Sequence, residues 1–256
     1  MFTNITLGQK NIGIEKSPNF RTYNGLKNSE GKRFREDVLF RSGSITALPS
    51  SDKLKIHDLK LTTIVDFRTD FEVQREPDDT AGLNVNSVRI PLGNINQQSS
   101  IQMFALLNSP NSTEATADSM MMSFYQNFAS MVKSYKSFFE ILLIPESKVL
   151  FHCSAGKDRT GIASALLLKA LDFDDQDIMS DFLRSNEAVG AVDVQKMKMY
   201  GIPEKMGSIL MGVKSTYLTE AISRINKEYG SLDKMLESEL GIGNKQKQML
   251  KDKYLQ

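Results

Sequence analysis

Short apolar runs alternate with longer amphipathic segments along the chain, which is the pattern of an α/β fold. Three runs have the length and β-branched content of buried strands: residues 61–67, 85–92 and 148–152. Residues 119–144 and 162–171 carry apolar side chains at helical spacing, and we expect both to be core-facing helices. The pattern therefore predicts a small, mainly parallel central sheet flanked by helices.

The C-terminal part of the chain is predicted to be helical. Residues 216–229, 232–240 and 245–255 have helical patterns, and Gly230 and Gly241 are typical helix stops. Their charges are mixed, as on solvated faces, so we expect these helices to complete the core.

One polar segment, residues 94–116, differs from its surroundings because it is rich in Asn, Gln, Ser and Thr around a short apolar centre. Such a segment between a strand and a helix is a solvated loop or a mobile lid over a site, and we favour the lid. No long linker or shift in composition divides the 256 residues, so we predict a single domain over residues 1–256.

Charge and composition exclude several classes of function. The 32 basic and 31 acidic side chains give a net charge of +1, which argues against a nucleic-acid-binding surface. No apolar run approaches the length of about 18 residues that spans a bilayer, so no integral membrane association is expected. The N-terminal residues lack a signal-peptide pattern. The sequence alone predicts a cytoplasmic protein, or a secreted one if a signal peptide has been removed.

Cysteine and histidine are too scarce for a structural metal site or a disulfide framework. The chain has one cysteine, Cys153, and two histidines, His57 and His152. We therefore expect neither a metal nor another cofactor.

The cysteine lies in the stretch with the clearest chemistry, residues 152–161, called the signature loop below. Its sequence is His-Cys-Ser-Ala-Gly-Lys-Asp-Arg-Thr-Gly, between a strand-like run and a helix-like run. The positive end of the helix dipole and the backbone N–H groups at a helix start bind anions and favour the thiolate of Cys153. Arg159 offers a planar fork for two phosphate oxygens. A cysteine that is only a small buried hydrophobe would not call for these neighbours.

Several further residues of the signature loop are expected to contact a bound phosphate. Thr160 or Ser154 is also placed to hydrogen-bond the sulfur when it becomes a leaving group. The expected phosphate-binding residues are Ser154, Ala155, Gly156, Lys157, Arg159, Thr160 and Gly161.

The signature loop is similar to that of the cysteine-dependent protein tyrosine phosphatase superfamily. The full ten-residue sequence resembles the bacterial branch of tyrosine and phosphoinositide phosphatases. Residues 19–21, 39–43, 64–68 and 181–186 also match this branch. One departure is visible at residues 22–25, which read Thr-Tyr-Asn-Gly where the branch usually has Asp-Leu-Gly-Gly.

The resemblance implies the roles of the reacting groups. Cys153 corresponds to the nucleophile and Arg159 to the phosphate-binding arginine. Other tyrosine phosphatases take their general acid from a Trp-Pro-Asp loop, but this chain has no tryptophan. The resembled branch uses the aspartate inside the signature loop, here Asp158. The alternatives are that Asp158 only caps the following helix and that Asp66 is the acid.

Three arginines in the matching segments are expected to rim or brace the site: Arg21, Arg41 and Arg68. The alternative is that they are surface arginines packed through their stems or paired with carboxylates such as Glu72.

Two loop residues have more specific expected roles. Lys157 adds a point charge near the phosphate and resembles a residue in the loop of phosphoinositide 3-phosphatases, which makes polyanionic substrates plausible. His152 is expected to donate a hydrogen bond that fixes the loop and favours the thiolate.

The sequence thus predicts a phosphomonoesterase that forms a phosphocysteine intermediate and acts on a phosphorylated protein or a phosphoinositide. The alternatives are a rhodanese-like sulfurtransferase and a catalytically inactive phosphate-binding module. Arsenate reduction is less favoured, because it normally needs further cysteines. The pattern does not indicate the oligomeric state.

Overall fold

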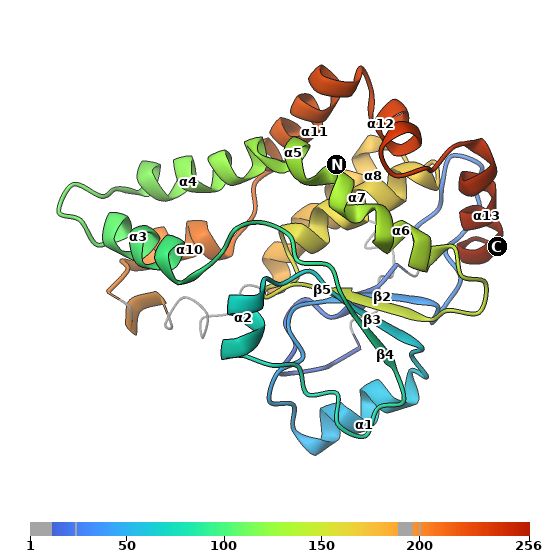
Figure 1. Ribbon diagram of the computed structural model, residues 1–256, viewed down its shortest axis with the longest axis horizontal. Coiled ribbons are helices and arrows are strands. Elements are labelled where there is room, and N and C mark those ends of the chain that lie inside the picture. The colour runs from blue at the N-terminus through green and yellow to red at the C-terminus, as the bar shows by residue number, and fades with distance from the viewer. Residues whose placement is uncertain (1–11, 24, 189–196, 200) are drawn as a thin grey trace, which may run out of the picture.

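A five-stranded sheet forms the centre of the protein (Figure 1). The computed structural model describes residues 12–23, 25–188, 197–199 and 201–256. The strands are β1 (Arg21–Thr22), β2 (Leu39–Ser42), β3 (Thr63–Asp66), β4 (Asn86–Arg89) and β5 (Val149–His152), in the order β1-β2-β5-β3-β4. Only β1 runs antiparallel to its neighbour. The predicted α/β class and mainly parallel sheet are confirmed, and β1 and β2 were not among the predicted strands.

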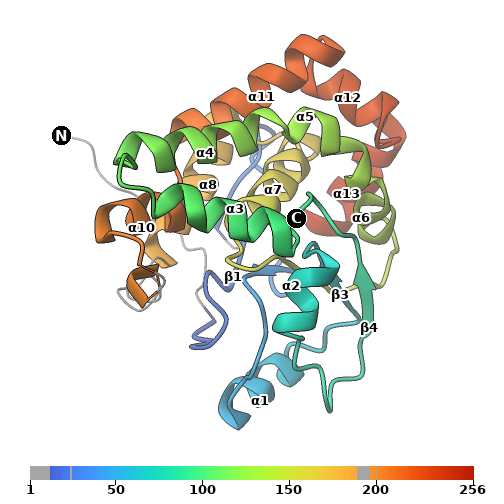
Figure 2. The same cartoon turned by 60° about the vertical axis from the view of Figure 1, so that its left-hand side comes forward.

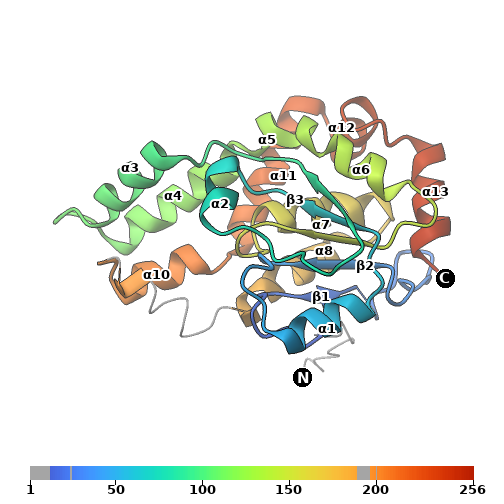
Figure 3. The same ribbon diagram turned by 60° about the horizontal axis from the view of Figure 1, so that its bottom comes forward.

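The strands β2, β3 and β5 are buried on both faces, whereas the edge strand β4 is mostly exposed. Successive side chains of a strand point to opposite sides, so each of the three buried strands contributes to two cores. In β5, Val149 and Phe151 belong to the larger hydrophobic cluster, whereas Leu150 belongs to a smaller one. Helix α1 (Ser50–Asp58) covers the face of the smaller cluster, and the remaining core helices cover the other face (Figures 1 and 3). The middle strand is therefore apolar throughout until it ends at His152.

Many helices surround this sheet, and most lie on the face of the larger cluster. Their bounds are α2 (Asp70–Arg75), α3 (Gln97–Leu107), α4 (Glu114–Gln126), α5 (Phe128–Met131), η1 (Val132–Tyr135), α6 (Lys136–Leu142), α7 (Arg159–Ala170), α8 (Asp175–Leu183), η2 (Arg184–Ala188), α10 (Glu204–Met211), α11 (Ser215–Tyr229), α12 (Leu232–Ser238) and α13 (Asn244–Tyr254). Helix α7 is the central one, with nearly every side chain buried.

The prediction of one long helix over residues 119–144 was wrong. Helix α4 begins earlier, at Glu114, and a break at Asn127 separates it from α5. The rest of the run continues as α5, η1 and α6. The side-chain amide of Asn127 donates to the carbonyl oxygen of Ser123, a local bond that competes with the regular helical ladder. The break lets aromatic residues from successive short helices face one core.

Residues 94–116 are not an irregular loop, because most of them form α3 and the start of α4. Asn96 caps α3 through a reciprocal pair of hydrogen bonds with Ser99. Helices α3, α4 and α10 lie side by side and extend away from the sheet (Figures 1 and 2). A separate hydrophobic cluster that includes Leu107, Ala117 and Met206 joins them. We call these three helices the helical arm.

The three predicted C-terminal helices are confirmed as α11, α12 and α13. Gly230 ends α11 with a φ of 87°, a conformation that glycine adopts readily. Helix α8 is capped by Asp174, whose side chain accepts a hydrogen bond from the backbone of Asp177, and it ends at Leu183, where η2 follows. Among the described helices, none has the length and apolar character needed to cross a bilayer.

Candidate active site

The signature loop leaves the middle of the sheet and ends at a helix start. Strand β5 ends at His152, and α7 begins at Arg159. Gly156 turns the loop with a φ of 67°, and a Cβ atom there would lie 2.4 Å from the carbonyl carbon and oxygen of Ser42. Only glycine meets both constraints without strain. The positive end of the α7 dipole therefore points at the loop, as in many anion sites.

Cys153 lies at the base of this loop with only 2% of its surface exposed. The carbonyl oxygen of its neighbour Ser154 accepts a hydrogen bond from the backbone N–H of Ser44, which ties the loop to the end of β2. On the other side, the N–H of Phe67 donates to the carbonyl oxygen of His152. The loop is thus anchored to both strands that flank β5.

Arg159 is held by a carboxylate that the sequence did not single out for this role. Its two terminal nitrogens donate to the two carboxyl oxygens of Glu72, each at 2.7 Å. Ser154 Oγ donates to the same carboxylate. Glu72 lies in α2, where it also closes a capping box with Thr69. The suggestion that Glu72 pairs with a surface arginine was wrong, because its partner is the loop arginine.

The ion pair is reflected in the ionisation of both partners. Burial alone would raise the pKa of Glu72, but hydrogen bonds and charge from Arg159 outweigh it and lower this pKa to about 2. Burial would lower the pKa of Arg159, whereas Glu72 and Cys153 raise it above the usual range. Arg159 is therefore a permanent cation, 5% exposed, that interacts electrostatically with Cys153.

Asp158 occupies the N-cap position of α7, but its side chain makes no capping hydrogen bond, which argues against capping as its role. Its carboxylate contacts Lys157, whose Nζ lies 2.9 Å from Oδ2 and 3.0 Å from Oδ1. The hydroxyl of Tyr125 donates to Oδ1 at 2.5 Å. Lys157 also donates to the carbonyl oxygen of Gly212, at 3.2 Å. The Asp158 side chain is half-buried and turned toward the region between the loop and α4.

Arg41 contacts the loop directly, and Arg21 is joined to Arg41 through a shared carboxylate. Both are buried and pair with Asp181 of α8. Arg41 also donates to the carbonyl oxygen of Gly156, at 2.8 Å. Burial, and then the neighbouring Arg41, lower the pKa of Arg21 to about 10, so it stays charged at neutral pH. Asn19 donates to the same Gly156 oxygen, at 2.6 Å.

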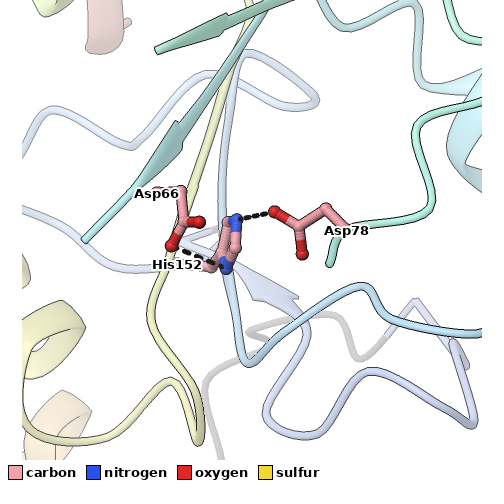
Figure 4. A group of neighbouring side chains, drawn as sticks. All are labelled: Asp66, Asp78 and His152. Carbon is pink, nitrogen blue, oxygen red and sulfur yellow. Dashed lines mark ion pairs between the residues drawn. The ribbon is translucent and has the colours of Figure 1, made fainter. Parts of the chain in front are cut away.

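Asp66 and Arg68 belong to a buried charge cluster that also includes Asp78 and His152. Figure 4 shows Asp66, Asp78 and His152. Arg68 donates to both oxygens of Asp66 and lies 2.7 Å from Asp78. The ring of His152 stands between the carboxylates, with Nε2 3.1 Å from Asp78 and Nδ1 3.4 Å from the carbonyl oxygen of Cys153. Asp66 is thus committed to Arg68, which argues against it as the general acid.

This cluster has the residue types of a metal site but not its charge arrangement. Ligand atoms of Asp66, Asp78 and His152 lie within 4.8 Å of one another. The guanidinium of Arg68 already supplies the positive charge to both carboxylates. Burial would raise the pKa of Asp78, but His152 and Arg68 outweigh it and lower this pKa. The cluster therefore fits a structural role in holding His152 and the start of the loop.

The last two loop residues, Thr160 and Gly161, are buried in the first turn of α7. Thr160 is fully buried, and its Oγ1 has no hydrogen-bond partner within the described part of the chain. Gly161 packs against the ring of Phe182, which a Cβ atom would approach to 3.0 Å. Tyr135 of η1, which the sequence assigned only to the core, donates to the carbonyl oxygen of Arg159. Tyr125 and Tyr135 were missed because an apolar helical run gives no sign of where a hydroxyl will point.

The chain is similar to several known phosphatases. A family model described as a tyrosine phosphatase family matches residues 12–256. A Cupriavidus necator protein assigned as a tyrosine-protein phosphatase is 29% identical over 240 residues, covering 92% of this chain and 86% of that protein. The triple specificity protein phosphatase PtpB of Mycobacterium tuberculosis is 28% identical over 77% of this chain and 84% of its own length. A solved structure, the core catalytic domain of the PP-IP phosphatase SIW14 from S. cerevisiae, covers 68% of this chain and 87% of that chain with 16% identity and a TM-score of 0.34.

Proposed function

The chain belongs to the tyrosine phosphatase family, and on that basis we propose that it hydrolyses phosphate monoesters through a covalent phosphocysteine at Cys153. The observation that carries this proposal is the state of Arg159. Its fork is buried, charged and fixed by Glu72, and it interacts electrostatically with Cys153. A phosphoryl group placed over the sulfur would meet this cation and the start of α7 together.

In the first step, the Cys153 thiolate attacks phosphorus while the bond from phosphorus to the leaving oxygen breaks. Asp158 gives its proton to that oxygen. In the second step, the Asp158 carboxylate takes a proton from water as the water oxygen attacks phosphorus. The sulfur–phosphorus bond then breaks, and inorganic phosphate and the thiolate are released. Arg159 and the loop amides stabilise the transferring phosphoryl group in both steps.

The proposed substrates are phosphotyrosine proteins, with phosphoserine, phosphothreonine and 3-phosphorylated inositol lipids as further candidates. The name of the triple specificity relative supports breadth. Within the site, Lys157 is the cation that supports a polyanionic substrate, although it now bonds Asp158 and must turn to reach a second phosphate. Arg21, Arg41 and Arg68 no longer support this breadth, because they are committed to buried carboxylates.

We further propose that residues 1–256 act as a single phosphatase domain and that the helical arm serves as a lid over the site. The lid is supported by the arm's separate hydrophobic cluster and by its extension from the sheet (Figure 1). Of the alternatives, membership of the family disfavours a rhodanese-like sulfurtransferase. The other alternative, an inactive phosphate-binding module, would be excluded by measured hydrolysis of a phosphomonoester.

The test of the proposal is phosphate release from p-nitrophenyl phosphate with and without a chelator. We expect turnover that the chelator does not change, because cysteine, arginine and aspartate supply all the chemistry. Turnover that disappears with chelator and returns with added metal would contradict the mechanism, and no turnover of any phosphomonoester would leave the inactive module as the better account.

The role of Asp158 has its own test, which depends on the leaving group. Asp158→Asn should slow phenyl phosphate by about 10² to 10⁴, the usual contribution of a general acid. An activated aryl phosphate, whose phenolate leaves without a proton, should be slowed far less. Equal slowing of both substrates would mean that Asp158 is not the acid.

A further inference from the structure

Tyr125 is a buried tyrosine whose hydroxyl reaches the carboxylate proposed as the general acid. It is the second-last residue of α4 and is fully buried. Its O–H donates to Asp158 Oδ1 at 2.5 Å. Its ring stacks on Tyr217, with centroids 5.2 Å apart, and meets Phe182 edge-on at 5.9 Å. The ring is therefore clamped, and the position of its hydroxyl is set by rigid packing.

The surroundings of Tyr125 do not by themselves require a hydroxyl. Its nearest aromatic neighbours include Phe124, Phe128 and Phe182, and a phenylalanine ring would pack among them equally well. The hydroxyl of the stacked Tyr217 points elsewhere, to Asp118 of α4. Within the described residues, the hydroxyl of Tyr125 thus makes one hydrogen bond, to Asp158.

The two oxygens of Asp158 have different neighbours. Oδ1 accepts from both Tyr125 and Lys157, whereas Oδ2, within the described residues, faces only Lys157. A carboxylic acid that donates a proton must present one particular oxygen to the leaving group. An unrestrained carboxyl group rotates about its Cβ–Cγ bond and presents either oxygen.

We propose that Tyr125 is a positioning residue for Asp158: its O–H holds Oδ1, so that Oδ2 carries the proton to the leaving oxygen. The inference rests on the proposed function, since it needs Asp158 to be the acid. When Oδ2 loses its proton, the bond from Tyr125 remains and strengthens, because its acceptor becomes a carboxylate. Tyr125 keeps its own proton in both steps.

The pKa of Tyr125 agrees with a hydroxyl that keeps its proton and remains a hydrogen-bond donor. Burial, and then the neighbouring Asp158 carboxylate, raise the pKa of Tyr125 well above its usual value. A phenol in this position stays protonated throughout the pH range in which a phosphatase works. It can orient the acid without competing as a second acid.

The experiment is a double-mutant cycle with purified full-length protein, measured on phenyl phosphate and on an activated aryl phosphate. The variants are Tyr125→Phe, Asp158→Asn and the double variant. We expect Tyr125→Phe to lower kcat on phenyl phosphate by about tenfold, the size of one hydrogen bond to a charged group. KM and the rate on the activated substrate should change little. In the Asp158→Asn background, Tyr125→Phe should have no further effect.

Tyr217→Phe is the matched control, because it removes a neighbouring hydroxyl that bonds Asp118 and leaves the aromatic stack in place. Its rate on both substrates should equal that of the wild type.

The outcomes separate this inference from the proposed function. If Tyr125→Phe slows both substrates equally, or slows the Asp158→Asn enzyme as much as the wild type, the positioning role is overturned. The positioning role is also overturned if Tyr125→Phe leaves kcat on phenyl phosphate unchanged while Asp158→Asn shows the expected leaving-group dependence. If Asp158→Asn itself shows no such dependence, the acid assignment fails first and the inference fails with it.

Discussion

Glu72→Gln tests whether the Glu72–Arg159 pair stabilises the site in the way its geometry indicates. The wild-type carboxylate accepts two hydrogen bonds from Arg159 and one from Ser154. Glutamine keeps the shape of the side chain but removes the charge and one acceptor. It therefore imitates the protonated form of Glu72, and its effect on stability can be calculated from the pKa.

The pKa of Glu72 falls from 4.5 to about 2 on folding, because the attraction of Arg159 exceeds the cost of burial. This shift corresponds to roughly 3 kcal/mol of stabilisation at pH 7. The pKa is depressed, so the stabilisation is complete above the unfolded-state pKa and is lost as the pH falls toward the folded-state pKa. At pH 3.5, the contribution should be roughly 1 kcal/mol smaller than at pH 7.

The assay is urea unfolding of the wild type and Glu72→Gln at pH 7 and pH 3.5. The difference in unfolding free energy should be roughly 3 kcal/mol at pH 7 and clearly smaller at pH 3.5. Asp70→Asn is the control, because Asp70 begins the same helix but pairs with Arg89 at the surface. Its difference should stay within about 1 kcal/mol. A Glu72→Gln difference that is the same at both pH values would refute the reasoning.

Two further predictions concern the backbone and the substrate. Gly156→Ala should lower the Tm much more than Gly82→Ala. Both glycines have positive φ, but only at position 156 would the new Cβ clash, because it would lie 2.4 Å from the backbone of Ser42. Equal losses of Tm would show that the loop can shift to make room. Lys157→Met should reduce hydrolysis of 3-phosphorylated inositol lipids more than hydrolysis of a phosphotyrosine peptide, since only the lipid offers a second phosphate to this cation. Equal reductions in the two rates would argue against a role for Lys157 in substrate choice.

The strands that could be predicted are those that lie in short runs with apolar or β-branched residues. Strand β5 is such a run, and β3 and β4 lie within the runs 61–67 and 85–92, although β4 itself is polar and mostly exposed. Strand β2 was not predicted because it ends in Arg41 and Ser42, two polar residues that are nevertheless buried. The charge of Arg41 is balanced by Asp181, which lies 140 residues away in the sequence. A strand pattern cannot show such a partner.

The same distinction applies to the site. Cys153, Asp158 and Arg159 lie within ten consecutive residues, so their chemistry could be inferred from local spacing. Glu72 and Tyr125 come from distant segments, and only the fold brings them to the signature loop. Glu72 stands three residues after Thr69, a spacing that signals a helix start and gives no hint of the arginine it binds.

The central claim is that Cys153 is the nucleophile, and phosphate release by Cys153→Ser tests it most directly. Serine is nearly isosteric, but its neutral hydroxyl is a poor nucleophile without an adjacent base. The account predicts that the purified variant stays folded, still binds inorganic phosphate and releases no phosphate from p-nitrophenyl phosphate above the uncatalysed rate. Substantial phosphatase activity in the folded Cys153→Ser variant would contradict the phosphocysteine mechanism.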